Sequence, residues 1–174
     1  MLLSVTDRDF AEEFSRCLAK ILGKSDLYKV RWSEKRKRWI VQGSSIFLYK
    51  FLRGGWRRLK GYIEHCYRCR ASFLRALFDG EGTIGRNRIS IYNTDLRLLL
   101  YIRRLLSKFG IDTGNPSVHS LAGSILRDPR TGVLYERRRD CYALTIRTDG
   151  SPLFARHIGF SIQRKSRLLP HPLA

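Results

Sequence analysis

The chain has 174 residues, 43% of them hydrophobic, which is enough for one or two small domains with a buried core. Its 34 lysines and arginines against 15 aspartates and glutamates give a net charge of +19, so we expect a polyanionic partner, nucleic acid before a membrane. No apolar run is long enough to cross a bilayer, and residues 1–4 are too short for the core of a signal peptide, which predicts a cytoplasmic, DNA-associated protein.

The first third of the chain predicts helices around one hairpin. Thr6 and Asp9 have the spacing of a capping box at the start of a first helix, which Gly23 ends. Residues 27–32 and 39–42 predict the two strands of a hairpin, joined by the basic residues 35–38. A second helix is expected over residues 46–52 and a third short one over residues 56–63.

The central stretch, residues 72–84, predicts a helix that ends in acidic residues and leads into a strand. Phe73, Leu74, Leu77 and Phe78 follow one another at helical spacing. Asp79 and Glu81 then fall at the helix C-terminus, where a nearby anion costs about 0.3–1 kcal/mol. A local conflict of this kind is typical of a functional site, and a bound cation would relieve it.

The remaining residues predict strands and helices in alternation. Residues 83–84 and 88–92 form a hairpin, and residues 93–95 begin a helix that Gly110 ends. Strands are expected over residues 117–121, 125–126, 133–135 and 142–147, and helices over residues 151–158 and 161–169.

Residues 74–82, LRALFDGEG, resemble the LAGLIDADG motif of homing endonucleases. The resemblance implies an α/β (α+β) fold: an αββαββα unit with a curved antiparallel DNA-binding sheet. It also places the family's catalytic acid, the eighth residue of the motif, on Glu81. Two positions depart from the pattern, because Ala76 stands where the motif has Gly and the acid is Glu rather than Asp.

A degenerate internal repeat indicates two domains. The segments that begin at Thr6 and Ser45 match those that begin at Thr94 and Ser151. Residues 1–66 then form a truncated repeat without its own motif helix, and residues 67–174 form the complete unit. The sequence leaves open whether Met1 is the natural start.

A single motif helix needs a second copy to pack against, so we expect a homodimer with the two Glu81 side chains near its twofold axis. The predicted interface residues are Phe73, Ala76, Leu77 and Gly80. The alternative is a monomer in which Ala76 and Gly80 pack on the N-terminal segment.

The resemblance further implies hydrolysis of DNA assisted by Mg²⁺ or another divalent cation. Glu81, beside Gly80, is the predicted metal ligand, because Mg²⁺ prefers hard oxygen ligands and takes only one or two carboxylates. By its position in the family, Lys165 is the predicted basic catalytic residue, with Gln163 and Arg164 as its rivals.

DNA contacts are expected on the strands and the basic turn, because a two-stranded ribbon fits the major groove and lysines or arginines in turns contact phosphates. The predicted DNA-binding residues are Lys29, Arg31, Lys35, Arg36, Lys37, Arg38, Arg86, Arg88, Ser90, Tyr92, Arg137, Arg139, Thr145, Arg147 and Arg164.

The pair Cys66 and Cys69 leaves three alternatives: a metal site with His65, a local disulfide, or buried thiols, which we expect because a structural zinc site wants four ligands. Taken together, the sequence predicts a site-specific homing endonuclease that cuts both strands of a long, pseudo-palindromic double-stranded DNA target and is encoded in an intron or intein-like element. The alternatives are a protein of the same fold that binds without cleavage, as an intron maturase or transcriptional regulator, and a basic ribosomal or RNA-binding protein.

Overall fold

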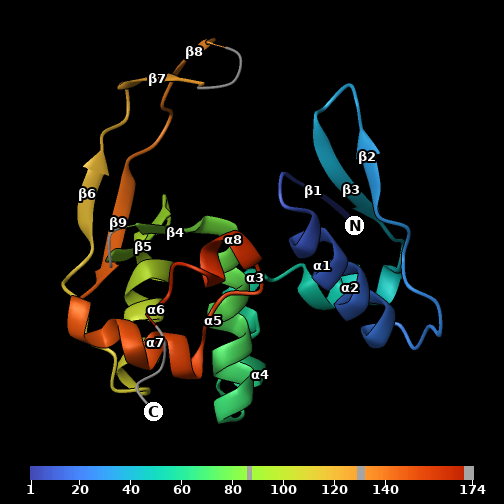
Figure 1. Ribbon diagram of the computed structural model, residues 1–174, viewed down its shortest axis with the longest axis horizontal. Helices are drawn as coiled ribbons and strands as arrows, with labels where there is room; N and C mark the ends of the chain where they lie inside the picture. The colour runs from blue at the N-terminus through green and yellow to red at the C-terminus, as the bar shows by residue number, and fades with distance from the viewer. Residues whose placement is uncertain (86–87, 129–131, 171–174) are drawn as a thin grey trace. The chain divides into compact units, whose positions relative to one another are not determined.

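A computed structural model describes residues 1–85, 88–128 and 132–170 (Figure 1). The chain divides into two compact units. Unit 1 contains Met1–Arg70 together with Ser161–Arg164, and unit 2 contains Ala71–Phe160 together with the residues from Lys165 onward. None of the described helices is long and apolar enough to span a membrane.

Unit 1 is a three-stranded antiparallel sheet, in the order β1-β3-β2, with helix α1 packed on β1 and β3. Its strands are β1 (Leu2–Val5), β2 (Arg31–Ser33) and β3 (Arg38–Gln42). Its helices are α1 (Arg8–Ile21), α2 (Ile46–Leu52), α3 (Gly55–Arg58) and α4 (Lys60–Glu64), followed by the first turn of α5 (Tyr67–Glu81).

The core of unit 1 comes from the face of α1 that meets the sheet. Ala11, Leu18 and Ala19 are buried there, opposite Val41 of β3. The hydroxyl of Ser15 donates a hydrogen bond of 2.7 Å to the carbonyl of Tyr28, which ties the helix to the segment before β2. Gly23, with φ +62°, ends the helix in the left-handed conformation that glycine adopts at little cost.

Unit 2 is a four-stranded antiparallel sheet, in the order β4-β5-β9-β6, with helices packed on it. The strands are β4 (Gly82–Gly85), β5 (Arg88–Asn93), β6 (Ser117–Ser120) and β9 (Cys141–Ile146). Beyond β6 and β9 lies a separate hairpin of β7 (Ile125–Arg127) and β8 (Leu134–Glu136) (Figure 1). The helices are most of α5, α6 (Leu96–Ser107), the short 3-10 turn Thr148–Gly150, α7 (Ser151–His157) and α8 (Gln163–Ser166), whose last two residues belong to this unit.

The core of unit 2 lies between one face of its sheet and the helices α5, α6 and α7. Ile89 pairs with Ile146 and Ile91 with Leu144, and all four side chains are buried. Phe78 of α5 packs edge-on against Phe154 of α7, with ring centroids 4.9 Å apart. The buried residues of the alternating strands and of the apolar stripe of α5 therefore lie in one core, as the two sequence patterns predict.

Several expected elements differ in the structure. Strand β1 was not predicted, because residues 2–5 form a strand only by pairing with β3, which lies far along the chain. The helix expected over residues 56–63 is two helices, and the final helix is only Gln163–Ser166. The motif helix begins at Tyr67, five residues earlier than expected.

The start of α1 also differs from the predicted capping box. Asp7 rather than Thr6 is the N-cap residue, and its side chain makes no cap hydrogen bond. Asp9 is occupied elsewhere, since its carboxylate accepts a hydrogen bond of 2.5 Å from the backbone N–H of Gln163. A contact between residues far apart in the sequence thus replaces the local one.

Candidate functional site

The end of helix α5 turns directly into strand β4, and this turn places Glu81 on the surface. A Cβ added to Gly82 would lie 2.5 Å from the carbonyl oxygen of Phe78 and 2.9 Å from its Cα, so only glycine permits so close an approach. Asp79 is buried, whereas Glu81, the last residue of the helix, is exposed. Of the two acids in the motif, Glu81 is therefore the one available to a ligand in solvent.

Lys165 lies on the buried side of the same helix end. Its side chain is only 5% exposed, and Nζ donates hydrogen bonds to the carbonyls of Phe78 at 3.0 Å, Asp79 at 2.6 Å and Gly82 at 2.7 Å. The last carbonyls of a helix lack partners within the helix and carry partial negative charge, so a buried ammonium stabilises them. These contacts make Lys165 a cap of α5, and its role in catalysis stays a prediction.

The two rivals of Lys165 belong to the other unit. The backbone of Gln163 donates to Asp9, and the guanidinium of Arg164 forms an ion pair with Asp7, with Nη2 2.9 Å from Oδ2. The hydrogen bond that Arg164 donates to Asp7 raises the pKa of Arg164 above its ordinary value. Both residues thus fasten the segment Ser161–Arg164 to the start of α1, a role that no local pattern in the chain indicated.

The outward face of the unit 2 sheet carries the polar residues that sequence alternation assigned to it. Ser90 lies opposite Thr145, with their hydroxyl oxygens 2.9 Å apart, and Tyr92 lies opposite Ala143. Arg88 and Arg147 are both exposed and follow directly on the paired Ile89 and Ile146. Ser90 is buried, whereas Tyr92 and Thr145 are half-buried, so the groups most open to a ligand on this face are the guanidinium groups of Arg88 and Arg147.

His119 of β6 belongs to the same face, and sequence reasoning did not include it. Its ring lies 4.6 Å from the ring of Tyr92, centroid to centroid. The two residues come from strands that β9 separates in the sheet. Only the alternation within residues 117–120 could have indicated it, and that stretch is too short to identify its outward side.

The other predicted DNA-binding residues are spread over both units. In unit 1 the exposed basic residues are Lys29, Arg31, Lys35, Arg36, Lys37 and Arg38. Most of these lie in or beside the β2–β3 turn, where Lys37 has φ +49° and contacts Glu34 at 2.6 Å. In unit 2, Arg139 is exposed and Arg137 is half-buried, its backbone hydrogen-bonded to Gly123 and Ser124. Arg86 lies outside the described residues.

The predicted dimer interface is a partly open stripe on α5. Ala76 and Gly80 are exposed, and a Cβ added to Gly80 would meet nothing within 4 Å. Leu77 is half-buried, and Phe73 is turned toward Tyr101 of α6, with ring centroids 6.1 Å apart. The small residues of the stripe are thus accessible, whereas Phe73 already packs within unit 2.

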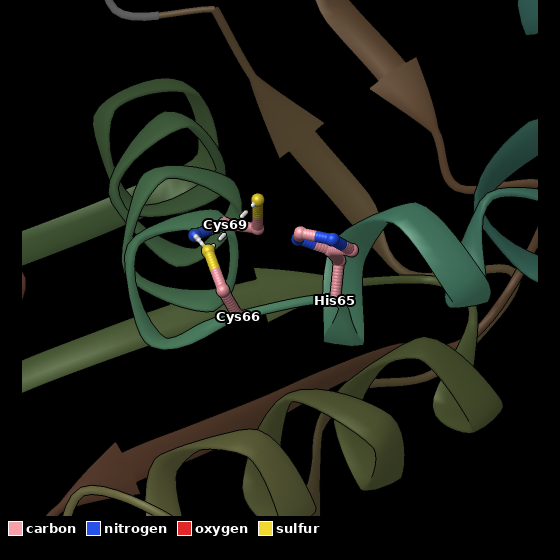
Figure 2. A group of neighbouring side chains, drawn as sticks. All are labelled: His65, Cys66 and Cys69. Atoms are coloured by element: carbon pink, nitrogen blue, oxygen red, sulfur yellow. Dashed lines mark hydrogen bonds between the residues drawn. The ribbon is translucent and has the colours of Figure 1, made fainter.

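A second cluster of reactive side chains lies where α4 ends and α5 begins (Figure 2). His65 is exposed and Cys66 and Cys69 are half-buried, so the two thiols are less enclosed than expected. The two sulfurs lie 3.3 Å apart, and the backbone N–H of Cys69 also donates to Cys66 Sγ at 3.3 Å. A hydrogen bond from His65 lowers the pKa of the Cys66 thiol to about 6, whereas its hydrogen bond with Cys66 raises the pKa of Cys69.

Residues 68–116 match the model of the LAGLIDADG-like domain family. Over 168 residues, 96% of its length, the chain is 32% identical to an uncharacterized protein of Methanocaldococcus jannaschii, and it spans 60% of that protein's length.

Solved structures of I-DmoI share the fold. Mesophilic variants of the homing endonuclease I-DmoI have a TM-score of 0.63 and 19% identity, covering 90% of this chain and 74% of that chain. I-DmoI in complex with DNA and Mn has a TM-score of 0.60 and 19% identity, covering 91% of this chain and 79% of that one. The complex with DNA and Ca has a TM-score of 0.60 and 18% identity, covering 90% and 73%. The family resemblance and the fold class expected from the sequence are confirmed.

Proposed function

Because the chain carries a LAGLIDADG-like domain and has the fold of a LAGLIDADG homing endonuclease, we propose that it binds double-stranded DNA and cuts both strands at a specific site. The observation that carries this proposal is the exposed Glu81 at the end of the motif helix. The protein retains the acid, and it is in solvent rather than in the core. The solved relatives in complex with DNA and Mn or Ca support the same substrate and a divalent cation.

Binding of DNA is supported by the charge and by the sheet of unit 2. A net charge of +19 favours association with the phosphate backbone and predicts that affinity falls as salt is added. The outward groups of β5 and β9, including Arg88 and Arg147, follow a two-stranded ribbon of the kind that fits the major groove. The exposed β2–β3 turn of unit 1 supplies further cations for phosphates.

The residues at the end of α5 suit a hard divalent cation such as Mg²⁺. Glu81 offers carboxylate oxygens, the donors that this ion prefers, and Gly80 leaves the space beside it open. A bound Mg²⁺ would stabilise charge on the scissile phosphate and lower the pKa of a coordinated water. The protein's own part is to hold Glu81 rigidly, since Lys165 and Gly82 fix the backbone on either side of it.

A homodimer would bring two copies of Glu81 together. Among the described residues, no group of three or more histidine, cysteine or acidic ligands includes Glu81. The exposed Ala76 and Gly80 leave room for another helix to approach α5 closely. A twofold arrangement would supply a second carboxylate and one acid for each DNA strand.

A selection experiment tests the nuclease function. The full chain is incubated with a randomised duplex library, with and without Mg²⁺, and cleaved ends are sequenced. We expect Mg²⁺-dependent double-strand cuts at a pseudo-palindromic site, abolished by Glu81→Gln. The matched control is Glu12→Gln, an exposed acid of α1 whose ion pair with Arg8 lies at the surface, which should leave cleavage unchanged.

Other outcomes point to different functions. Tight duplex binding without product in any divalent cation contradicts the nuclease and supports a regulator. Preference for structured RNA over the duplex supports a maturase. The molar mass in solution tests assembly: twice the mass of one chain supports the homodimer, and a monomer that still cuts both strands contradicts it.

A further inference from the structure

The side chains of His65, Cys66 and Cys69 lie together at the corner between α4 and α5, away from the acid of the motif helix. Figure 2 shows them turned toward one shared space. One ligand atom from each residue can be chosen so that all three lie within 4.8 Å of one another. Within the described residues this is the one group of three or more histidine, cysteine or acidic side chains with that geometry. The cluster lies entirely within unit 1.

The spacing of the cluster is close to that of a tetrahedral metal site. Bonds of about 2.3 Å to sulfur and about 2.0–2.1 Å to nitrogen place two sulfurs about 3.8 Å apart in a tetrahedron, and a sulfur and a nitrogen about 3.6 Å apart. The two sulfurs are already 3.3 Å apart, so they need to move by only a few tenths of an ångström. Both cysteines are half-buried and His65 is exposed, so none of the three side chains is enclosed in the core.

The chemistry of the three donors favours one kind of metal. Thiolates are soft ligands and imidazole is intermediate, a set that suits Zn²⁺ and does not suit Mg²⁺ or Ca²⁺. Two thiolates also balance the two charges of the ion. The three ligands are close together in the sequence. His65 is the C-cap residue of α4, Cys66 lies in the connection, and Cys69 is in the first turn of α5.

We propose that His65, Cys66 and Cys69 bind one Zn²⁺, with three protein ligands and a fourth position taken by water. Both cysteines bind the ion as thiolates, and any proton still on a thiol is released to solvent. The ion ties the end of α4 to the first turn of α5 across a connection of only two residues, His65 and Cys66, all within unit 1. This site is separate from the proposed cleavage of DNA, and either can fail without the other.

Metal analysis of the full chain tests the proposal. The reduced protein is freed of metal with a chelator, dialysed against Zn²⁺ in excess Mg²⁺, and analysed for bound zinc by elemental analysis. We expect one zinc per chain, and with Co²⁺ in its place an absorption band of thiolate-to-cobalt charge transfer.

Single substitutions identify the ligands. Cys66→Ser and Cys69→Ser should each abolish stoichiometric zinc and the charge-transfer band. His65→Ala should retain the band but lower the affinity by about tenfold or more, because one of three ligands is lost. The matched control is Cys17→Ser, which removes an exposed cysteine elsewhere in unit 1 and should change nothing. Circular dichroism of each variant without metal verifies that it is folded.

Three results would overturn the proposal. One is a reduced, folded protein that takes up no stoichiometric zinc. Another is zinc binding that survives the loss of Cys66 or Cys69. The third is a protein purified without oxygen whose mass and peptide map show a disulfide between these two cysteines, because a disulfide removes both thiolate ligands.

Discussion

Units 1 and 2 are two versions of one architecture. The strand order β1-β3-β2 in unit 1 corresponds to β5-β9-β6 in unit 2, and α1 corresponds to α6. Asp7 and Asp95 are the N-cap residues of these helices, and Gly23 and Gly110 follow them with φ +62° and +71°. Unit 2 also contains β4, the main part of α5 and the hairpin of β7 and β8, which have no counterpart in unit 1.

The presence of β4 and α5 in unit 2 changes how deeply the helices common to both units are buried. In unit 2, Phe154 of α7 is fully buried against Phe78 of α5, and Phe109 after α6 is 7% exposed. In unit 1, α1 and α2 instead border an apolar groove of about 720 Å³, and Ile21 is 64% exposed. The motif helix therefore completes the core of its unit as well as carrying the acid, and the unit without it keeps an apolar face on its surface.

The largest expected difference in the free energy of unfolding is between substitutions at Phe154 and at Leu48, its counterpart in the repeat. Phe154→Ala should lower the free energy of unfolding by about 3–5 kcal/mol, because a fully enclosed ring leaves a cavity. Leu48→Ala should cost about 2 kcal/mol, at the low end for its kind, because Leu48 borders the groove. Chemical denaturation with hydrogen exchange in each unit measures both. Equal losses would contradict the difference between the two cores.

Lys165 and Arg164 offer a neighbouring pair in which each residue serves a different unit. Lys165→Met removes three buried hydrogen bonds to the end of α5 and should cost about 2–4 kcal/mol. Arg164→Met removes an exposed ion pair with Asp7 and should cost less than about 1 kcal/mol. Thermal or chemical unfolding measures the difference. Unchanged stability with lost cleavage in Lys165→Met would instead assign Lys165 to the chemistry.

A third pair of substitutions, at Phe47 and Leu153, tests the apolar groove that α1 and α2 border. Phe47 of α2 is 83% exposed, so Phe47→Ser should change the free energy of unfolding by no more than about 0.5 kcal/mol. The same change should lower the binding of a hydrophobic dye, since it removes an aromatic ring from the groove. The matched variant is Leu153→Ser in unit 2, whose half-buried side chain lies near Gly110 and which should destabilise more and leave dye binding unchanged.

The smallest effect concerns cysteine reactivity and leaves stability untouched. In the reduced, metal-free protein, Cys66 has a pKa of about 6, so it is mostly thiolate at pH 7 and mostly protonated below pH 6. Burial raises the pKa of Cys17, and Cys141 of unit 2 is buried. Brief alkylation at pH 7 followed by peptide mapping should therefore label Cys66 first. Labelling that does not fall as the pH drops to 5 would contradict the lowered pKa.

The sequence by itself determined the motif helix and the alternation of the strands of unit 2. These signals are local: a 3.6-residue stripe through Leu74 and Phe78, and a two-residue alternation through Ile89 and Ile91, set which side of each element is buried. The position of Glu81 at the end of that helix also follows from the motif, because Gly82 permits the turn into β4.

Only the tertiary structure decided which partners the polar residues take. Lys165 meets three carbonyls of a segment more than eighty residues away, and Arg164 beside it pairs with Asp7. His119 joins Tyr92 only because β9 brings β5 and β6 into one sheet. The physical reason is that hydrogen bonds and ion pairs between distant residues depend on how the elements pack, and no local spacing in the chain encodes that packing.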